Sequence, residues 1–267
     1  MRNIVPLMLL IAFFLARDVS ASALLMPSAR NYGGVIINNF SRQAGLQPVR
    51  FDHWLHRSLY TCRLCHVDIG FAMEENETKI TADANSKGLY CGACHDGART
   101  YNGKKIFPSC SKGAIKSEDA KRCNRCHSFG KAGEKQEYDY ATFTARFPKQ
   151  NFRNLIDWEK AESEKLIQPI DFLEGISFRR RALNAEKDFS ITAKTTWMPG
   201  IIFSHKKHVI WNGCEVCHPE IFPSVRKGEL KYTMLEIAGG QYCGVCHNRV
   251  AFPLNECERC HRNPVGP

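Results

Sequence analysis

Apolar residues gather in only a few stretches of this 267-residue chain, and the first of them is at its N-terminus. Residues 4–16 form an apolar run that follows Arg2 and precedes a polar stretch ending in Ala-Ser-Ala, the layout of a secretory signal peptide cleaved after Ala23. The alternative is an uncleaved anchor, but thirteen apolar residues fall short of the about 20 that span a bilayer. No second run of that length follows, so we expect a soluble exported protein, periplasmic or at the cell surface.

Two further stretches have a readable pattern. Gly33-Gly34 followed by apolar residues 35–37 predicts one short strand. Between residues 152 and 166 apolar side chains recur near helical spacing, with Glu and Lys largely on the other side, which predicts a short amphipathic helix. Its apolar members are Leu155, Ile156, Trp158, Ala161 and Leu166. The fold class predicted is therefore mostly coil with short α-helices and little strand.

The candidate chemistry lies in the cysteines. Six times the sequence reads Cys-x-x-Cys-His, the covalent attachment site of c-type haem, in which the histidine can bind the iron axially. A zinc site or a disulfide framework explains the cysteine spacing but not a histidine after every second cysteine. We therefore predict six covalently bound haem c groups, numbered 1 to 6 in chain order. Their motifs are Cys62/Cys65/His66, Cys91/Cys94/His95, Cys123/Cys126/His127, Cys214/Cys217/His218, Cys243/Cys246/His247 and Cys257/Cys260/His261.

The six predicted haems change how the chain length and the net charge are interpreted. The mature chain would supply only about 41 residues per haem, too few to enclose each macrocycle in an apolar core of its own. The haems are therefore expected to form the core. The formal charge of +10 would favour nucleic acid or acidic membranes, but haem propionates would cancel most of it, and no basic run with interleaved aromatics is present. We exclude a nucleic-acid partner.

An internal repeat organises the motifs. A shift of 152 residues superimposes residues 51–95 on 203–247 without a gap, which aligns the first two motifs of each set of three. The third motif breaks this register, because 27 residues separate His95 from Cys123 but only nine separate His247 from Cys257. A duplicated three-haem unit, with an insertion of 18 residues in its first copy, is the simplest explanation.

This repeat defines the predicted domains. They are a signal peptide (1–23), a leader (24–50), a first module (51–127), a linker with the amphipathic helix (128–202) and a second module (203–267). We expect the helix to pack between the modules, with docking of a partner as the alternative. The insertion holds Cys110, the one cysteine outside a motif. We expect a solvent-facing loop thiol there, with an intermolecular disulfide or a redox role as alternatives.

Four histidines lie outside the motifs, as two pairs at i, i+3. They are His53/His56 and His205/His208. On one helical turn such side chains project from the same face, so a single turn could serve two haems. The identical spacing in both repeats favours axial ligation of iron over solvated surface histidines.

The Phe-x-His-x-x-His element followed by three attachment motifs resembles the small triheme c7-type cytochromes, relatives of the c3 class, here in tandem. The resemblance covers residues 51–127 and 203–261. It implies a haem-cored multihaem cytochrome of two tandem c7-like modules. It also implies the axial pairs His53/His66, His56/His95, His205/His218 and His208/His247.

The sequence departs from that family at the third haem of each module. In the family a histidine between the first and second motifs serves this haem, but residues 67–90 and 219–242 contain none. Met73 and Met234 are the candidates, and a thioether ligand would raise the reduction potential. The repeat shift of 152 residues does not align Met73 with Met234. An open site, a lysine or a ligand from another chain are the alternatives for haems 3 and 6.

These observations predict an exported hexahaem cytochrome that relays electrons between redox partners through closely spaced, mostly bis-His haems. The partners would be other redox proteins or extracellular acceptors, and self-association through exposed haems is a further option. Two imidazoles per iron leave no place for a substrate, so we do not expect an enzyme. The alternative is a reductase of a small oxyanion at haem 3 or 6. No motif has a lysine in place of its histidine, which counts against it.

Overall fold

The fold is taken from a computed structural model of the chain. It describes residues 27–110, 120–128, 140–151, 153–180, 187–193, 197–224, 226, 229 and 231–262. The predicted signal peptide and its cleavage site lie outside these residues, as does residue 152, where the amphipathic pattern begins. Across the described ranges, no helix combines the length and apolar character needed to cross a membrane.

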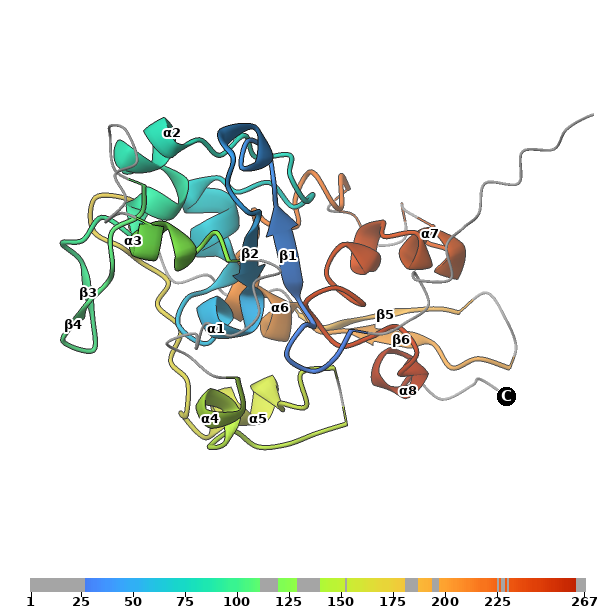
Figure 1. The fold of residues 1–267 in the computed structure, drawn as a ribbon. Helices are drawn as coiled ribbons and strands as arrows, with labels where there is room; N and C mark the ends of the chain where they lie inside the picture. Colours follow the sequence, from blue (N-terminus) through green and yellow to red (C-terminus); the bar gives the residue numbers. More distant parts are fainter. Residues whose placement is uncertain are drawn as a thin grey trace, which may run out of the picture.

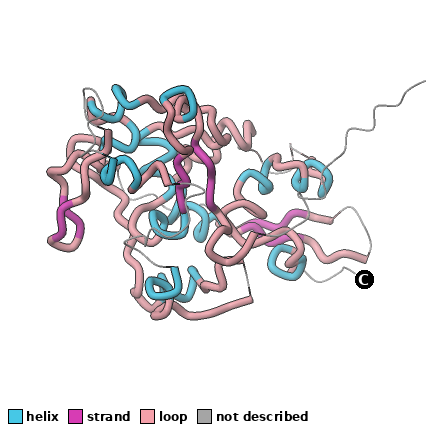
Figure 2. Tube along the Cα trace, viewed as in Figure 1, coloured by secondary structure: helices cyan, strands magenta, loops and turns pink. Residues whose placement is uncertain are grey.

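Loops make up most of the described chain, and the helices are short (Figure 2). The α-helices are α1 (His53–Arg57), α2 (Ala82–Ser86), α3 (Ala120–Asn124), α4 (Tyr140–Thr144), α5 (Trp158–Ser163), α6 (His205–Asn212), α7 (Met234–Ala238) and α8 (Cys257–Cys260). Tighter or wider helical turns are η2 (Arg42–Ala44), η3 (Leu64–Ile69), η4 (Tyr90–Ala93) and η6 (Tyr242–Val245). The prediction of mostly coil with short helices and little strand is confirmed.

The described strands form three antiparallel hairpins. These pair β1 (Gly34–Ile37) with β2 (Val49–Asp52), β3 (Thr100–Tyr101) with β4 (Lys104–Lys105), and β5 (Phe189–Ile191) with β6 (Ile201–Phe203). The strand predicted at residues 35–37 is confirmed as part of β1. The hairpins β1–β2 and β5–β6 each lead directly into a helix that carries a histidine pair, α1 and α6 (Figure 1).

These two hairpins extend the repeat upstream of residues 51 and 203, which fall inside β2 and β6. In β1–β2, Val35 lies opposite Phe51, and in β5–β6, Phe189 lies opposite Phe203. The separation between the paired residues is two residues shorter in β5–β6 than in β1–β2. A shift of 152 residues without a gap therefore fails to align β1 with β5, although both copies have the same hairpin.

Among the described residues, an apolar cluster is built mainly from the linker. Its buried members are Phe147, Ile156, Ala161 and Ile167, and Tyr140, Phe143, Trp158 and Trp211 pack against them. Trp54 of α1 makes an edge contact with Tyr140, with ring centres 5.1 Å apart. Trp211 belongs to α6. The linker thus packs against the histidine-bearing helix of each module.

The amphipathic helix is shorter than predicted, because it begins at Trp158. Leu155 has a φ of 56°, in the left-handed region that a leucine adopts at a cost. The side chain of Asp157 then caps the first turn by accepting a backbone N–H. Ile156 is buried as expected, but Leu155 and Leu166 are exposed, so the predicted apolar stripe is wrong at both ends.

The two modules lie side by side, with α1 and α6 near the centre of Figure 1. The guanidinium of Arg57 in α1 lies 4.6 Å from the ring centre of Trp158 and 5.4 Å from that of Trp211. The same group donates a hydrogen bond of 2.8 Å to the carbonyl of Val250 in the second module. The hydroxyl of Tyr32, which lies upstream of β1, donates a hydrogen bond to the carbonyl of Ala251, the residue after Val250. Leader, linker and second module therefore meet at the base of α1.

A candidate multihaem site

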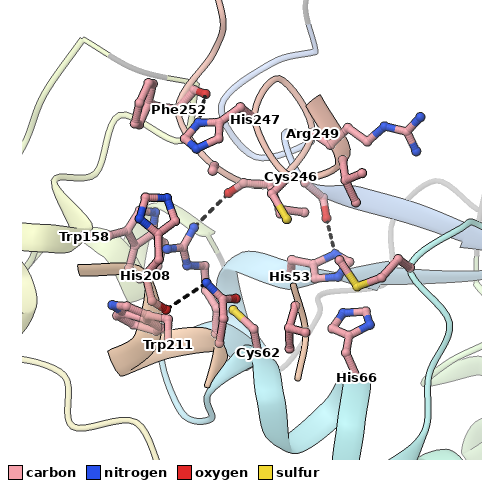
Figure 3. Close-up of a pocket in the computed structure, with 18 of the residues that line it drawn as sticks. His53, Cys62, His66, Trp158, His208, Trp211, Cys246, His247, Arg249 and Phe252 are labelled. Atoms are coloured by element: carbon pink, nitrogen blue, oxygen red, sulfur yellow. Dashed lines mark hydrogen bonds between the residues drawn. The ribbon is translucent and has the colours of Figure 1, made fainter. Parts of the chain in front are cut away.

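A continuous cavity of about 3340 Å³ runs through both modules. All of the motif cysteines except Cys123 and all of the histidines except His127 line it. A pocket for one small molecule measures roughly 300–1,000 Å³, so this space fits several large ligands and not one. Figure 3 shows Cys62 of the first motif and Cys246 of the fifth lining the same part of it.

Three pairs of histidine rings face each other across this cavity. Ring centres are 6.5 Å apart in His53/His66, 6.4 Å in His56/His95 and 6.3 Å in His208/His247. The rings of His53 and His66 lie within 3° of parallel, and Figure 3 shows them one above the other. Two imidazoles bound to one metal by bonds of about 2 Å place their ring centres about 6 Å apart. The geometry of these residues fits bis-imidazole ligation of a haem iron.

The fourth pair implied by the family, His205 with His218, makes no such ring contact in the part of the chain that the structure describes. His205 packs instead against Phe189 and Phe203, with ring centres 5.1 and 4.9 Å away. Its ligation of haem 4 stays a prediction.

The phenylalanine of each Phe-x-His-x-x-His element contacts both of its histidines. Phe51 lies 4.9 Å from His53 and 4.3 Å from His56 between ring centres. In the second module the Phe203 ring lies 4.9 and 4.4 Å from its two histidines. The last strand of each hairpin thus supplies the ring that holds both imidazoles in place, which explains why the spacing recurs.

Backbone carbonyls orient nearly all of the histidines. The Nδ1 atoms lie 2.6 to 3.3 Å from a carbonyl oxygen in His53, His56, His66, His95, His127, His208, His218, His247 and His261. Such a bond fixes the tautomer and leaves Nε2 free to bind a metal. The exception is His205, whose Nδ1 is buried without a partner.

Burial keeps the facing imidazoles neutral. It lowers the pKa of His53, His56 and His247 to about 4, with smaller opposing contributions from their backbone hydrogen bonds. The neutral imidazole is the form that binds a metal. These side chains are therefore in the binding-competent state throughout the neutral range.

Cysteines of different attachment motifs lie near one another, as their effects on each other's pKa indicate. The pKa of Cys65, Cys91 and Cys246 is raised to about 12, mainly by burial. The next largest contribution comes in each case from a cysteine of another motif, which is Cys94 for Cys65, Cys126 for Cys91 and Cys62 for Cys246. Motif 1 is thus close to motif 2, motif 2 to motif 3, and motif 5 to motif 1.

Two more contacts complete the series. The pKa of Cys217 and of Cys243 is raised to about 11, first by burial and then by Cys62 and Cys260, respectively. Motif 4 therefore also lies beside motif 1, and motif 5 beside motif 6. Cys217 also raises the pKa of Cys243 and Cys246, so motifs 1, 4 and 5 are mutual neighbours. Among the described residues the six attachment sites are therefore connected across the module boundary, and motifs 3 and 6 each have one neighbouring motif.

The third motif of each module shares a contact that the sequence reasoning missed. Arg125 and Arg259 are the middle residues of Cys-x-Arg-Cys-His, and their guanidinium groups stack over Phe107 and Phe252 at 5.0 and 4.5 Å. The carbonyls of the same two phenylalanines accept from the histidines of motifs 2 and 5. The repeated Cys-x-Arg-Cys-His was the available signal. The third motif of each module thus contacts the phenylalanine whose carbonyl orients the histidine of the motif before it.

The expectation for Cys110 is wrong. Its side chain is half-buried rather than solvent-facing, and the amide nitrogen of Asn85 donates a hydrogen bond of 3.9 Å to its sulfur. Met73 and Met234 both line the cavity, and Met234 is 51% exposed at the start of α7. Iron ligation by either methionine stays a prediction.

Comparisons with known proteins agree with these motifs. The model of the family described as cytochrome c7 and related cytochrome c matches residues 49–128 and again residues 201–262. None of the curated proteins matches the chain significantly.

Among solved structures, the chain is similar to a c7-type three-heme cytochrome domain, with 31% identity over 28% of this chain and 93% of that domain, at a TM-score of 0.26. It is also similar to the C-terminal hexaheme fragment of GSU1996, with 22% identity over 89% of this chain and 99% of the fragment, at a TM-score of 0.26. The N-terminal hexaheme fragment of the same protein gives 21% identity over 87% and 99%, at a TM-score of 0.25.

Proposed function

Because this chain belongs to the family of cytochrome c7 and related cytochromes c, it carries covalently bound haem c, and we propose that it is a hexahaem relay of electrons between redox partners. The observation that carries this proposal is the unbroken succession of neighbouring attachment cysteines from motif 3 to motif 6. A relay needs its redox groups close together and held at fixed distances, and the rigid motifs supply that arrangement.

In this proposal each haem iron supplies a one-electron couple, and the protein residues fix its position and surroundings. The two cysteines of each motif would attach the porphyrin, and the histidine that follows would ligate the iron. His53, His56, His205 and His208 would supply the second imidazole to haems 1, 2, 4 and 5. Double imidazole ligation blocks substrate access there, which favours electron transfer over catalysis.

The boundary between the modules is the part of the relay that most needs explanation. Cys62 is the neighbour of both Cys217 and Cys246, so haem 1 would be the contact from the first module to the second. Arg57 fixes this boundary through Trp211 and the carbonyl of Val250. One cation shared by two modules keeps their attachment sites in register.

The setting of the relay follows from the same proposal. Haem c is attached outside the bacterial cytoplasm, so we infer export through the N-terminal segment and action in the periplasm or at the cell surface. The partners would be other redox proteins or extracellular acceptors that contact the haems at the two ends. Self-association through those ends would lengthen the relay.

The test is to remove one site in the middle of the relay and one at its end. In Cys62→Ala/Cys65→Ala the modules lose their contact, and in Cys123→Ala/Cys126→Ala only an end is lost. After a reducing pulse, we expect electron equilibration across the purified holoprotein to slow at least about tenfold in the first variant. The second should equilibrate its remaining haems at the original rate.

The mass of each variant checks that five haems remain. Unchanged kinetics in the Cys62→Ala/Cys65→Ala variant would overturn the relay, because electrons would then cross between the modules without haem 1.

A further inference from the structure

The first attachment motif touches the start of the fourth. Arg63 follows Cys62 within the first motif and is buried. Its side chain lies against the backbone of Gly213, the residue before the fourth motif. A Cβ atom at position 213 would lie 2.5 Å from Cδ of Arg63 and 2.8 Å from the carboxylate of Glu215. Gly213 also has a φ of 63°, a conformation that suits glycine. A glycine at this position thus allows the two motifs to approach each other closely.

Arg63 and Glu215 occupy the same position in the repeat but have opposite charges. The shift of 152 residues aligns one with the other, each directly after the first cysteine of its motif. Two identical copies would bring like charges together at this contact, which costs free energy. The change of sign removes that repulsion, so the duplicated motifs can lie side by side within one chain.

A linker arginine connects the two motifs through a carboxylate on each side. The Nε atom of Arg180 donates a hydrogen bond of 2.9 Å to Glu215, and its Nη2 atom donates one of 2.8 Å to Asp68. Asp68 lies three residues after Cys65, and its side chain is 1% exposed. Arg63 is a second cation near it, with Nη1 3.7 Å from the carboxylate. A buried carboxylate needs such partners, and Arg180 shares its own charge with the second module.

The preceding part of the linker is tied to the first motif. The backbone N–H of Thr61 donates to the carbonyl of Ile170 at 3.1 Å. The carboxylate of Asp171 accepts a hydrogen bond of 2.6 Å from the Thr61 hydroxyl and one of 3.2 Å from Nε of Arg63. Arg180 follows nine residues later. The linker is therefore fixed on the first motif before Arg180 reaches the fourth.

The contact between the first module and the fifth motif is less direct. Arg57 donates to the carbonyl of Val250, which lies beyond the last residue of that motif, His247. At the fourth motif, by contrast, a residue of motif 1 packs on the residue next to Cys214, and an arginine bonds to a residue inside the motif. The geometry therefore favours motif 4 as the partner of motif 1.

We propose that Arg180 is a positioning residue that holds motif 1 against motif 4, so that the haems of these two motifs are the pair through which electrons cross between the modules. The inference rests on the proposed relay. In the crossing, the ferrous iron of one haem loses one electron and becomes ferric, the ferric iron of the other gains it and becomes ferrous, and no bond is made or broken. The electron comes from a redox partner. Arg180 contributes by keeping the distance between the two attachment sites fixed.

The first test compares Arg180→Met and Glu215→Ala with two controls. Glu215→Gln keeps an oxygen that can accept from Arg180, and Arg179→Met removes a neighbouring arginine whose side chain is 81% exposed. The readouts are the pairwise redox interaction between haems 1 and 4, from a redox titration followed by NMR, and the rate of electron equilibration between the modules after a reducing pulse. We expect both test variants to weaken the interaction and to slow the equilibration severalfold. Both controls should match the unmodified protein.

Glu215→Ala keeps the pair of Arg180 and Asp68, so it tests the inference even where Arg180→Met does not fold. An unchanged interaction between haems 1 and 4 in a folded Glu215→Ala protein with six haems by mass would overturn the role of Arg180.

A second comparison separates motif 4 from motif 5. Removing haem 4 in Cys214→Ala/Cys217→Ala should abolish fast crossing, whereas removing haem 5 in Cys243→Ala/Cys246→Ala should leave exchange between the first module and haem 4 at its original rate. Fast crossing that persists without haem 4 would overturn this inference and leave the relay standing. Fast crossing that persists in Cys62→Ala/Cys65→Ala would instead overturn the proposed function.

Discussion

The two modules are nearly the same at the histidine pair of their second motif and differ around their first and third. At the first motif, His53 and His66 face each other, whereas His205 and His218 make no ring contact among the described residues. In both, a hairpin leads to a helix with two histidines, and the phenylalanine before the helix contacts both rings at almost equal distances. The facing pairs His56/His95 and His208/His247 are 6.4 and 6.3 Å apart. Repetition has thus kept the phenylalanine contacts of both histidine pairs and the geometry of the imidazoles that face each other at the second motifs.

The surroundings of the third attachment motif differ between the two modules. In the first module the buried amide of Asn85 donates to the sulfur of Cys110, whereas the corresponding turn of the second module has Ile237 and the half-exposed Met234. The third motifs are also the two ends of the connected set of motifs. Unlike ligands at the two ends would set two different potentials there, so the difference between the modules would give the relay a direction.

The largest effect is expected where the modules are the same. Gly92→Ala and Gly244→Ala each place a Cβ atom 1.8 Å from a backbone oxygen, so the chain itself must move. We expect both to lower the free energy of unfolding by about 3 kcal/mol or more. Thermal unfolding of the holoproteins measures this. Gly88→Ala is the control, because its Cβ meets open space and only the φ of 82° opposes it, at about 1 kcal/mol. A large loss of unfolding free energy in only one of the two glycine variants would show that the turns at Gly92 and Gly244 are not equivalent.

The next effect concerns a position where the modules differ. Arg57 corresponds to Val209 under the repeat, and its guanidinium bridges the modules. Arg57→Met removes one charged hydrogen bond and two ring contacts, for an expected loss of about 2 kcal/mol. Calorimetry should then show the two modules unfolding in separate steps.

Arg249→Met is the matched control, because Arg249 also bridges the modules, but through an exposed ion pair of 3.5 Å with Glu74. Such pairs contribute at most about 1 kcal/mol. Equal losses from both variants would mean that Arg57 has no special role at the boundary.

A smaller effect should appear at high pH. Burial raises the pKa of Tyr32 to about 12 from an ordinary value of 10.0, with Arg153 and Arg57 acting in the opposite direction. Because the folded-state pKa is the higher one, the stabilisation is complete below pH 10 and is lost as the pH rises from 10 to 12. Tyr32→Phe loses the hydrogen bond across the modules, about 1 kcal/mol at pH 7. It should also lose part of the alkaline dependence. Denaturant titrations at several pH values check this, and parallel alkaline curves for both proteins would argue against it.

The smallest effect on stability, and a clear spectral one, is expected at the second end. Met234→Leu conserves volume at a half-exposed position, so the free energy of unfolding should change by less than about 1.5 kcal/mol. A methionine-to-iron band should disappear, and the potential of haem 6 should fall. Leu235→Met, one residue further along α7 and 84% exposed, is the control and should alter neither. An unchanged spectrum in Met234→Leu would mean that haem 6 takes another ligand.

The chemistry of this protein could be predicted further than its fold. The six motifs and the histidine pairs can be recognised directly in the sequence. The family match confirms the resemblance to c7-type cytochromes that they indicate. Short helices, little strand and the strand at residues 35–37 were also predicted correctly. These features depend on residues close together in the chain.

What could not be predicted depends on residues far apart in the chain. No pattern tells that Gln47 provides the carbonyl for His127, 80 positions away, or that Pro199 does so for His261. The amphipathic helix was placed too early because periodicity does not report the left-handed φ of Leu155. The expectation for Cys110 failed because an insertion was assumed to be a surface loop, whereas the Cys110 side chain is half-buried against the amide of Asn85.

The central claim is that the relay has four haems with two imidazole ligands and two haems, 3 and 6, that lack a second histidine. Near-infrared magnetic circular dichroism of the ferric holoprotein, with six haems confirmed by mass, tests it most directly. We predict charge-transfer intensity for four bis-imidazole haems and a different signal from the haems at Cys123/Cys126 and Cys257/Cys260. Six equal bis-imidazole haems would contradict the account.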